Sequence, residues 1–262
     1  MGRKEIAGRL ASSLDESVRG RTASIDNVAI AFSGGLDSSL IACLASRYTK
    51  PVLYVVGEEN SSDLIGARMS AHILELPLKE IILSDSEVEG ALPSIVDVLE
   101  STHSVLVSYK IPQFFVTMSA QEDVILIGNG ADELFGGYSK YERLDPGMMM
   151  EAMQSDLEKL LKIEIPMDNR MGHKFGKTFE YPFLSADVIE VAMEAPTDLK
   201  VGEEGHKMIL RDAAKKFGLP TEISDRKKKA AQYGTGATKI LRRIAKSRGL
   251  SVSKYIENLG DF

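Results

Sequence analysis

Short apolar runs alternate with helix-like stretches over the first half of the chain, and this alternation limits the fold more than any other feature. Runs with the length and composition of buried strands occur at 27–32, 51–57, 78–83 and 123–130. Stretches with helical periodicity lie between them. Apolar strands that alternate with helices indicate a parallel sheet covered by helices on both faces. We therefore predict a doubly wound α/β domain.

Helical patterns precede and follow this alternating part. The first 20 residues carry apolar side chains at the spacing of an amphipathic helix. A helix is also predicted over 111–120, with Pro112 in its first turn. From residue 148 onward the strand-like runs stop. We therefore predict three parts: an N-terminal helix over 1–26 packed on the body, an α/β body over 27–147, and a mostly helical subdomain over 148–262 that completes the site.

The first strand-like run leads into a glycine turn and a helix, with the sequence SGGLDSS at 33–39. Such a turn can bind an anion, because successive backbone N–H groups converge and the helix N-terminus adds partial positive charge. The string matches neither GxxxxGK-S/T nor GxGxxG. It instead contains Asp37, and an aspartate beside phosphate is explained by a bridging divalent cation. Asp37 is therefore a candidate Mg²⁺ ligand.

A second glycine-bearing segment, 128–130, also follows a strand-like run. Ligands of doubly wound sheets bind in the crevice outside the carboxyl ends of the strands. Both glycine segments occupy that position, so we expect them to face one crevice.

Composition limits the class of protein but does not identify a function. The chain is 44% hydrophobic, and no apolar run approaches the ~20 residues that span a bilayer. The N-terminal stretch lacks the apolar middle of a signal peptide, so we expect a cytoplasmic protein without a membrane partner. The single cysteine, Cys43, excludes an internal disulfide and a four-cysteine zinc site.

Charge is unevenly distributed along the chain. Net charge is −6, yet residues 206–254 carry 14 Lys and Arg against 3 Asp and Glu. Two interpretations remain open: this part binds an anionic ligand or partner, or its basic helices dock on an acidic body.

Longer strings resemble a known family. SGGLDSS after a buried strand resembles the pyrophosphate loop (PP-loop) of the N-type ATP pyrophosphatases. IGNGADELFGGY at 127–138 is similar to the asparagine synthetase signature SGEGSDE-hydrophobic-FGGY. NRMGHKFGKTFEYPFL at 169–184 aligns without a gap on a further motif of that family, and 206–236 resembles its K-x-x-L-R and R-x-K segment. The chain thus resembles an asparagine synthetase-like synthetase domain without the N-terminal glutaminase domain.

This resemblance implies a fold and an activity. The implied fold is adenine nucleotide alpha hydrolase-like: a doubly wound, mainly parallel five-stranded sheet with a helical C-terminal subdomain. The implied enzyme is a C–N ligase that uses ATP and Mg²⁺, adenylates a small-molecule carboxylic acid, and forms AMP and pyrophosphate as ammonia or an amine attacks. Nitrogen would come from free ammonia, an amine or a separate glutaminase subunit. We also expect a homo-oligomer.

The resemblance assigns roles residue by residue. Asp37 and Asp132 match the two aspartates that hold Mg²⁺. Lys228 matches a lysine that contacts the phosphates and stabilises departing pyrophosphate. The pyrophosphate cradle corresponds to Ser33, Gly34, Gly35, Ser38 and Ser39. The positions that frame the adenosine correspond to Ala31, Val56 and Gly128.

The chain departs from the family on the substrate side. Asn129 replaces a glutamate that serves the amidation half-reaction, and Asn cannot accept a proton as a general base does. The family's E-x-R is Thr178-x-Glu180 here. Asn129 and Glu180 are therefore candidate catalytic residues beside Lys228. Either Glu180 or another group supplies the base, or the ATP chemistry serves a different acyl acceptor or donor.

Two alternatives to an amide synthetase are kept. The basic C-terminal stretch is compatible with a tRNA-modifying ATP pyrophosphatase, although nucleic acid is not the partner we favour. The changed substrate-side residues are compatible with an ATP-binding regulatory homologue that has no amidation activity.

Overall fold

Five strands form one parallel sheet in the order β3-β2-β1-β4-β5. The computed structural model describes residues 2–226 and 234–260. The strands are β1 (Asn27–Ala31), β2 (Lys50–Gly57), β3 (Leu78–Ile82), β4 (Val124–Leu126) and β5 (Thr178–Glu180). The strand order reverses direction beside β1, which pairs with both β2 and β4. The doubly wound parallel sheet is confirmed, and this reversal is where such sheets bind ligands.

Alternate strand residues enter two separate cores. Ile30 and Val55 are buried in the core on one face of the sheet, whereas their neighbours Ala29 and Val56 are buried in the core on the other face. Because both faces are covered, the strands have continuous apolar runs instead of alternating apolar and polar residues.

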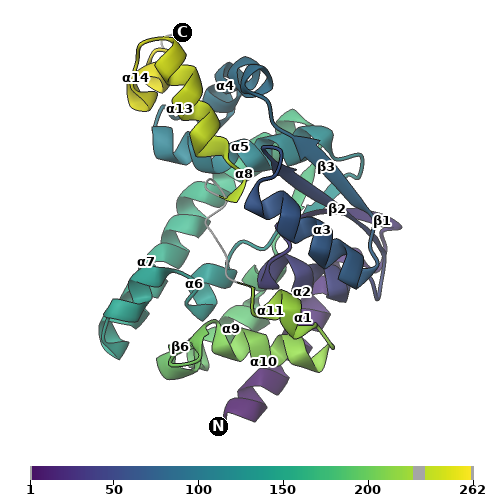
Figure 1. Ribbon diagram of the computed structural model, residues 1–262. Helices are drawn as coiled ribbons and strands as arrows, with labels where there is room; N and C mark the ends of the chain where they lie inside the picture. Colours follow the sequence, from purple (N-terminus) through teal and green to yellow (C-terminus); the bar gives the residue numbers. More distant parts are fainter. Residues whose placement is uncertain (1, 227–233, 261–262) are drawn as a thin grey trace.

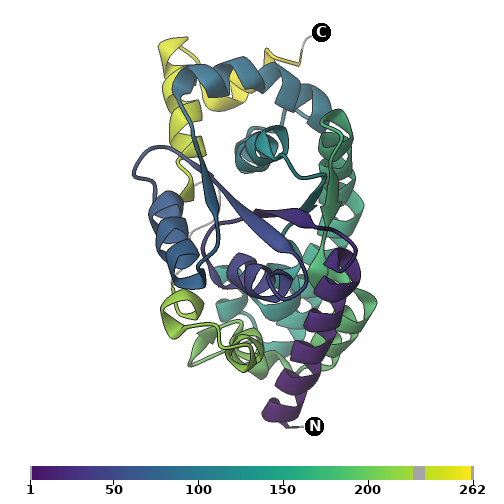
Figure 2. The same ribbon diagram turned by 90° about the vertical axis from the view of Figure 1, so that its right-hand side faces the viewer.

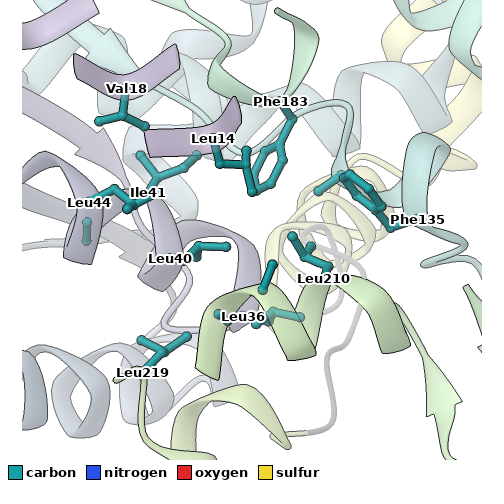
Figure 3. Packing of buried hydrophobic residues seen from close by; sticks show 14 of the residues in the cluster. Leu14, Val18, Leu36, Leu40, Ile41, Leu44, Phe135, Phe183, Leu210 and Leu219 are labelled. Atoms are coloured by element: carbon teal, nitrogen blue, oxygen red, sulfur yellow. The ribbon is translucent and has the colours of Figure 1, made fainter. Parts of the chain in front are cut away.

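The first face carries the N-terminal helix and the helix after the glycine turn. Figure 3 shows Leu14 of the former close to Ile41 of the latter, with Phe183 beside them. The N-terminal helix therefore contacts the helix that follows the glycine turn. Helices of this face are α1 (Arg3–Thr22), α2 (Leu36–Ala45), α3 (Ser62–Leu74), α6 (Ala131–Phe135), α9 (Ala186–Glu194), α10 (Met208–Lys216) and α11 (Thr221–Ser224).

A second group of helices covers the opposite face, as Figure 2 shows with the sheet between the two layers. The last helices of the chain lie beside α4 (Figure 1). Helices of this face are α4 (Asp85–Leu99), α5 (Ser104–Ser119), α8 (Ile165–Lys174), α13 (Ala237–Ser247) and α14 (Val252–Glu257).

The remaining elements surround the carboxyl ends of the strands. Helix α7 (Pro146–Lys159) continues through a π-helical turn, η2 (Leu160–Glu164), into α8. A short antiparallel hairpin precedes α10. The other elements are the 3₁₀ turns η1 (Ser139–Arg143), η3 (Pro182–Leu184) and η4 (Thr197–Leu199) and the hairpin strands β6 (Val201–Gly202) and β7 (Gly205–His206).

Two local predictions were wrong. Strands do not stop before residue 148, because β5 pairs with β4 at the edge of the sheet. Pro112 does not lie in a first turn, because α5 begins at Ser104 and runs through it. The helix continues past the proline because Ile111 and Phe115, on either side of it, are both buried in the core. In the part of the chain that the structure describes, no helix is long and apolar enough to cross a membrane.

Candidate active site

The predicted pyrophosphate turn packs against helix α3. Gly34 has φ +67°, and a Cβ there would lie 2.6 Å from the carbonyl oxygen of Gly66. The hydroxyl of Ser70 donates to the Gly34 carbonyl oxygen at 2.8 Å. Only glycine fits this position, because it tolerates the left-handed conformation and has no side chain to collide with α3.

The turn opens into a cavity of about 380 Å³ at the carboxyl ends of β1, β2 and β4. Three members of the predicted loop line this cavity, namely Ser33, Asp37 and Ser38. The predicted adenosine frame lines it as well, through Ala31, Val56 and Gly128. The structure therefore brings the two predicted halves of a nucleotide site together.

The hydroxyls of the predicted cradle differ in position. The backbone N–H of Ser33 donates to Oγ of Ser38 at 3.3 Å, which closes the turn. Ser39 is fully buried, and its hydroxyl has no hydrogen-bond partner among the described residues. Ser33 and Ser38 line the cavity and Ser39 does not, so only the first two are placed to contact phosphate directly.

The two predicted Mg²⁺ ligands, Asp37 and Asp132, both contact the side-chain ammonium of Lys207. Nζ of Lys207 lies 2.7 Å from both carboxylate oxygens of Asp37 and 2.6 Å from Oδ1 of Asp132. Lys207 precedes α10, has φ 56° and is only 5% exposed. Lys207 was not among the residues predicted from the sequence. The feature that could have identified Lys207 is its position as the lysine of the K-x-x-L-R string. Nothing in the neighbouring sequence predicts which acidic side chains it contacts.

Two glycines allow this convergence. A Cβ on Gly137 would lie 1.8 Å from Oδ1 of Asp132 and 2.5 Å from Cε of Lys207. A Cβ on Gly128 would lie 3.3 Å from Cβ of Asp37. The glycines of the second motif therefore let the backbone approach the acidic pair closely.

The site suits Mg²⁺ together with phosphate. Mg²⁺ is commonly held by one or two carboxylates plus substrate phosphate oxygens. Asp37 and Asp132 supply two carboxylates that already share one positive charge. Within 2–226 and 234–260, no group of three or more His, Cys, Asp or Glu could hold a metal. A magnesium ion held by these two carboxylates would complete its coordination with phosphate oxygens and water.

The cavity continues past Asp132 to a group of polar and aromatic side chains. Glu133 is 7% exposed and accepts a hydrogen bond from the Tyr138 hydroxyl at 2.5 Å. Burial raises the pKa of Glu133, and burial also raises the pKa of Tyr138, so the phenol stays protonated and donates. Tyr109 lines this end as well. Glu133 was missed although it directly follows Asp132 in the second motif.

A fully buried ion pair lies behind Asn129. Nζ of Lys110 is 2.6 Å from Oδ1 of Asp168, and both side chains have no exposed surface. The other oxygen of Asp168 accepts from the Asn129 amide and the Tyr181 hydroxyl, each at 3.4 Å. Asn129 lines the cavity, so the structure places this predicted residue at the site.

One other predicted catalytic residue, Glu180, is not brought to the cavity. Glu180 pairs with Arg21 of α1 at 3.0 Å and is absent from the cavity lining, so its position does not favour a catalytic role. Lys228 lies outside the described residues. Arg226, which is described, contacts the glycine turn. Its guanidinium donates to the carbonyl oxygen of Ser33 at 2.5 Å.

The basic C-terminal part docks on the acidic body. Arg243 pairs with Glu58 at 2.8 Å and with Asp85 at 2.5 Å, and Arg248 pairs with Glu89 at 2.7 Å. Together with Lys207 on the aspartates, these contacts engage part of the described positive charge within the molecule. This favours the docking interpretation over a nucleic-acid partner.

The sequence profile of the asparagine synthase family matches residues 9–149 and 145–255. The chain belongs to the asparagine synthase family. The chain is 35% identical over 295 residues to a putative glutamine-hydrolyzing asparagine synthetase of Methanocaldococcus jannaschii, covering 98% of this chain and 54% of the relative.

Other curated relatives are more distant. The glutamine-hydrolyzing asparagine synthetase of Gallus gallus is 27% identical, over 86% of this chain and 43% of its own. A carboxyethyl-arginine beta-lactam-synthase of Streptomyces clavuligerus is 25% identical, over 97% of this chain and 49% of its own. The chain thus spans about half the length of these curated relatives.

Proposed function

We propose that this chain is an ATP-dependent amide synthetase that forms AMP and pyrophosphate. The observation that carries the proposal is that Asp37 and Asp132 lie together beside the glycine turn, where both pair with the Lys207 ammonium. A nucleotide would place its adenosine against Ala31, Val56 and Gly128 and its phosphates at Ser33 and Ser38. Asp37 and Asp132 would hold Mg²⁺, which offsets the phosphate charge as pyrophosphate departs.

The proposed reaction has two steps. A carboxylate oxygen of the acid attacks the α-phosphorus of ATP, and the bond to the bridging oxygen breaks with its electron pair leaving on pyrophosphate. Ammonia or an amine then forms the C–N bond, and AMP leaves with the electron pair of the broken acyl–oxygen bond. The proton lost from nitrogen passes to water. The buried turn, Lys207 and the helix N-terminus supply positive potential where pyrophosphate accumulates charge.

Pyrophosphate release tests this proposal. The purified protein is incubated with ATP, Mg²⁺ and a panel of amino and dicarboxylic acids, with and without ammonium chloride. We expect release that depends on one acid and yields an amide, and Asp37→Asn serves as the blank. If no acid supports release above that blank, the proposal is wrong. Tight binding of ATP without turnover would instead favour the regulatory alternative.

The nitrogen donor is part of the proposal. Relatives of this family carry the name glutamine-hydrolyzing, and this chain spans about half their length. We propose that nitrogen arrives as ammonia, as an amine or from a separate glutaminase subunit. Amide formation with ammonium chloride but not with glutamine alone would support this view.

A further inference from the structure

Two amide side chains line the end of the cavity beyond Asp132. Gln113 comes from the middle of α5, and Asn129 comes from the glycine segment that follows β4. Both are connected to the buried pair of Lys110 and Asp168. The structure thus links two cavity-lining amides through one charged pair that has no exposed surface.

The charged pair determines how each amide is turned. The Lys110 ammonium only donates, and it lies 3.2 Å from Oε1 of Gln113. The Asp168 carboxylate accepts at 3.4 Å from Nδ2 of Asn129. If the Gln113 amide were flipped, its N–H₂ would face the Lys110 ammonium. If the Asn129 amide were flipped, its carbonyl oxygen would face the Asp168 carboxylate. Gln113 therefore keeps its N–H₂ available, and Asn129 keeps its carbonyl oxygen available.

The available donor on Gln113 has no hydrogen-bond partner in the part of the chain that the structure describes. The side chain is 9% exposed, and its Nε2 is buried without a hydrogen bond to any described residue. Leaving a buried amide donor unpaired is unfavourable, because the donor gives up its hydrogen bond to water and gains none in the protein. A side chain that carries this cost on the wall of a cavity is placed to bind a ligand acceptor.

We propose that Gln113 and Asn129 form the subsite for the reacting acyl group and its nitrogen nucleophile. Nε2 of Gln113 donates to the acyl carbonyl oxygen, and Oδ1 of Asn129 accepts from an N–H of the nucleophile. This inference rests on the proposed function, because it assigns the second step of that reaction. Lys110 and Asp168 are positioning residues, since they act only through the two amides.

The pair matches the charges that develop as nitrogen attacks. The C–N bond forms while the carbonyl oxygen gains negative charge, so a donor at Gln113 binds it more strongly than in the ground state. The attacking nitrogen gains positive charge, so an acceptor at Asn129 stabilises it. The acyl–oxygen bond then breaks toward AMP, and nitrogen releases its proton to water. Asn129 orients the nitrogen and takes no proton.

One donor beside one acceptor also fits a primary amide better than a carboxylate. An amide has an acceptor oxygen for Gln113 and an N–H for Asn129. A carboxylate offers only acceptors, so one of its oxygens would face the Asn129 carbonyl oxygen without a hydrogen atom between them. The subsite should therefore bind a small amide in preference to the corresponding acid.

Gln113→Met tests the subsite kinetically, because Met keeps the length of the side chain and removes the donor. With the acid found in the pyrophosphate screen and ammonium chloride, we expect amide formation to fall about 10²–10³-fold, the loss typical of one such donor. ATP–pyrophosphate exchange, which reports adenylation, should fall less than about tenfold. Unchanged amide formation would overturn the proposal.

The chain offers a matched control in Gln121. Its Oε1 also accepts from a lysine, Lys79, at 2.8 Å, but it does not line the cavity. Gln121→Met should form amide at the wild-type rate. If both variants lose activity equally, the effect is one of stability and the proposal is wrong.

Binding of acetamide and acetate gives a readout that needs no turnover. The side-chain amide signal of Gln113 in a ¹⁵N NMR spectrum is identified by its absence in Gln113→Met. We expect acetamide to shift this signal more than acetate at equal concentration, with the Gln121 signal unmoved. If no acid supports pyrophosphate release, the proposed function fails, and this measurement still decides the subsite. No shift, or an equal shift with acetate, would overturn it.

Discussion

The side-chain nitrogen of Lys207 lies 2.7 Å from each carboxylate oxygen of Asp37, although 170 positions separate the two residues. This contact joins the start of α10 to the first turn of α2. Because Lys207 also contacts Asp132, one buried ammonium holds both proposed magnesium ligands. In this state the lysine supplies the positive charge that the two carboxylates require.

Removing this ammonium should destabilise the protein and make its stability depend on magnesium. Lys207→Met leaves two carboxylates without their cation, and removing one partner of a buried pair costs about 3–5 kcal/mol. We expect that loss in the free energy of unfolding by urea without ligand, and partial recovery with ATP and Mg²⁺. Lys216→Met, which changes an exposed lysine at the end of α10, is the control. Equal stability of the two variants would contradict the account.

Alanine at Gly34 should damage the turn more than alanine at Gly176. The two glycines have φ +67° and +66°, but a Cβ on Gly34 meets the α3 backbone whereas a Cβ on Gly176 meets nothing within 4 Å. Gly176→Ala should cost about 1–2 kcal/mol for its left-handed backbone. Gly34→Ala should lose about 1–3 kcal/mol more from the collision and should bind ATP weakly. Equal losses in urea unfolding would show that the turn does not press on α3.

Variants of the buried pair of Lys110 and Asp168, which lies behind Asn129, should change stability and activity separately. Lys110→Met should destabilise by about 3–5 kcal/mol, because it leaves Asp168 buried and charged. The double variant Lys110→Met/Asp168→Leu should recover most of that stability. Its KM for ammonium should exceed that of the wild type, because Asp168 then no longer accepts from the Asn129 amide. A double variant with wild-type KM would show that the pair is structural only.

Lys200 should make stability rise at alkaline pH. Burial lowers the pKa of Lys200 to about 8, below the ordinary lysine value of 10.5. Between these values the unfolded chain binds the proton and the folded chain does not, so stability increases as pH rises through this window. Below about pH 8 both states are charged and the folded state carries the full penalty, about 3 kcal/mol by linkage.

Lys200→Met removes that penalty and checks the prediction. In urea unfolding it should be more stable than the wild type at pH 7, and its advantage should shrink between pH 8 and pH 10. Lys239→Met, at an exposed lysine, should show no such trend. A constant advantage across this range would mean that Lys200 does not titrate there.

The parallel sheet could be predicted because its inner strands are buried on both faces. A strand covered on both sides must be apolar throughout, and that pattern is visible without knowing its neighbours. β5 could not be found in this way. Its residues, Thr178, Phe179 and Glu180, form no apolar run and are a strand only because they pair with β4.

The sequence predicts more of the residues that line the proposed nucleotide part of the cavity than of the contacts behind its other end. Asp37 and the glycine turn are local in sequence, so their geometry follows from the motif itself. Lys207, Lys110 and Asp168 act through partners far along the chain, and no local pattern reports such contacts. Glu180 was expected at the site for its residue type, but it pairs with Arg21 of the N-terminal helix.

The most direct test of the account identifies the bond of ATP that the protein breaks. ATP labelled with ³²P at the α position and, separately, at the γ position is incubated with the protein, Mg²⁺, ammonium chloride and the active acid, and the products are separated. We expect labelled AMP from the first and labelled pyrophosphate from the second, in equal amounts and absent in Asp37→Asn. Labelled ADP and inorganic phosphate would contradict it.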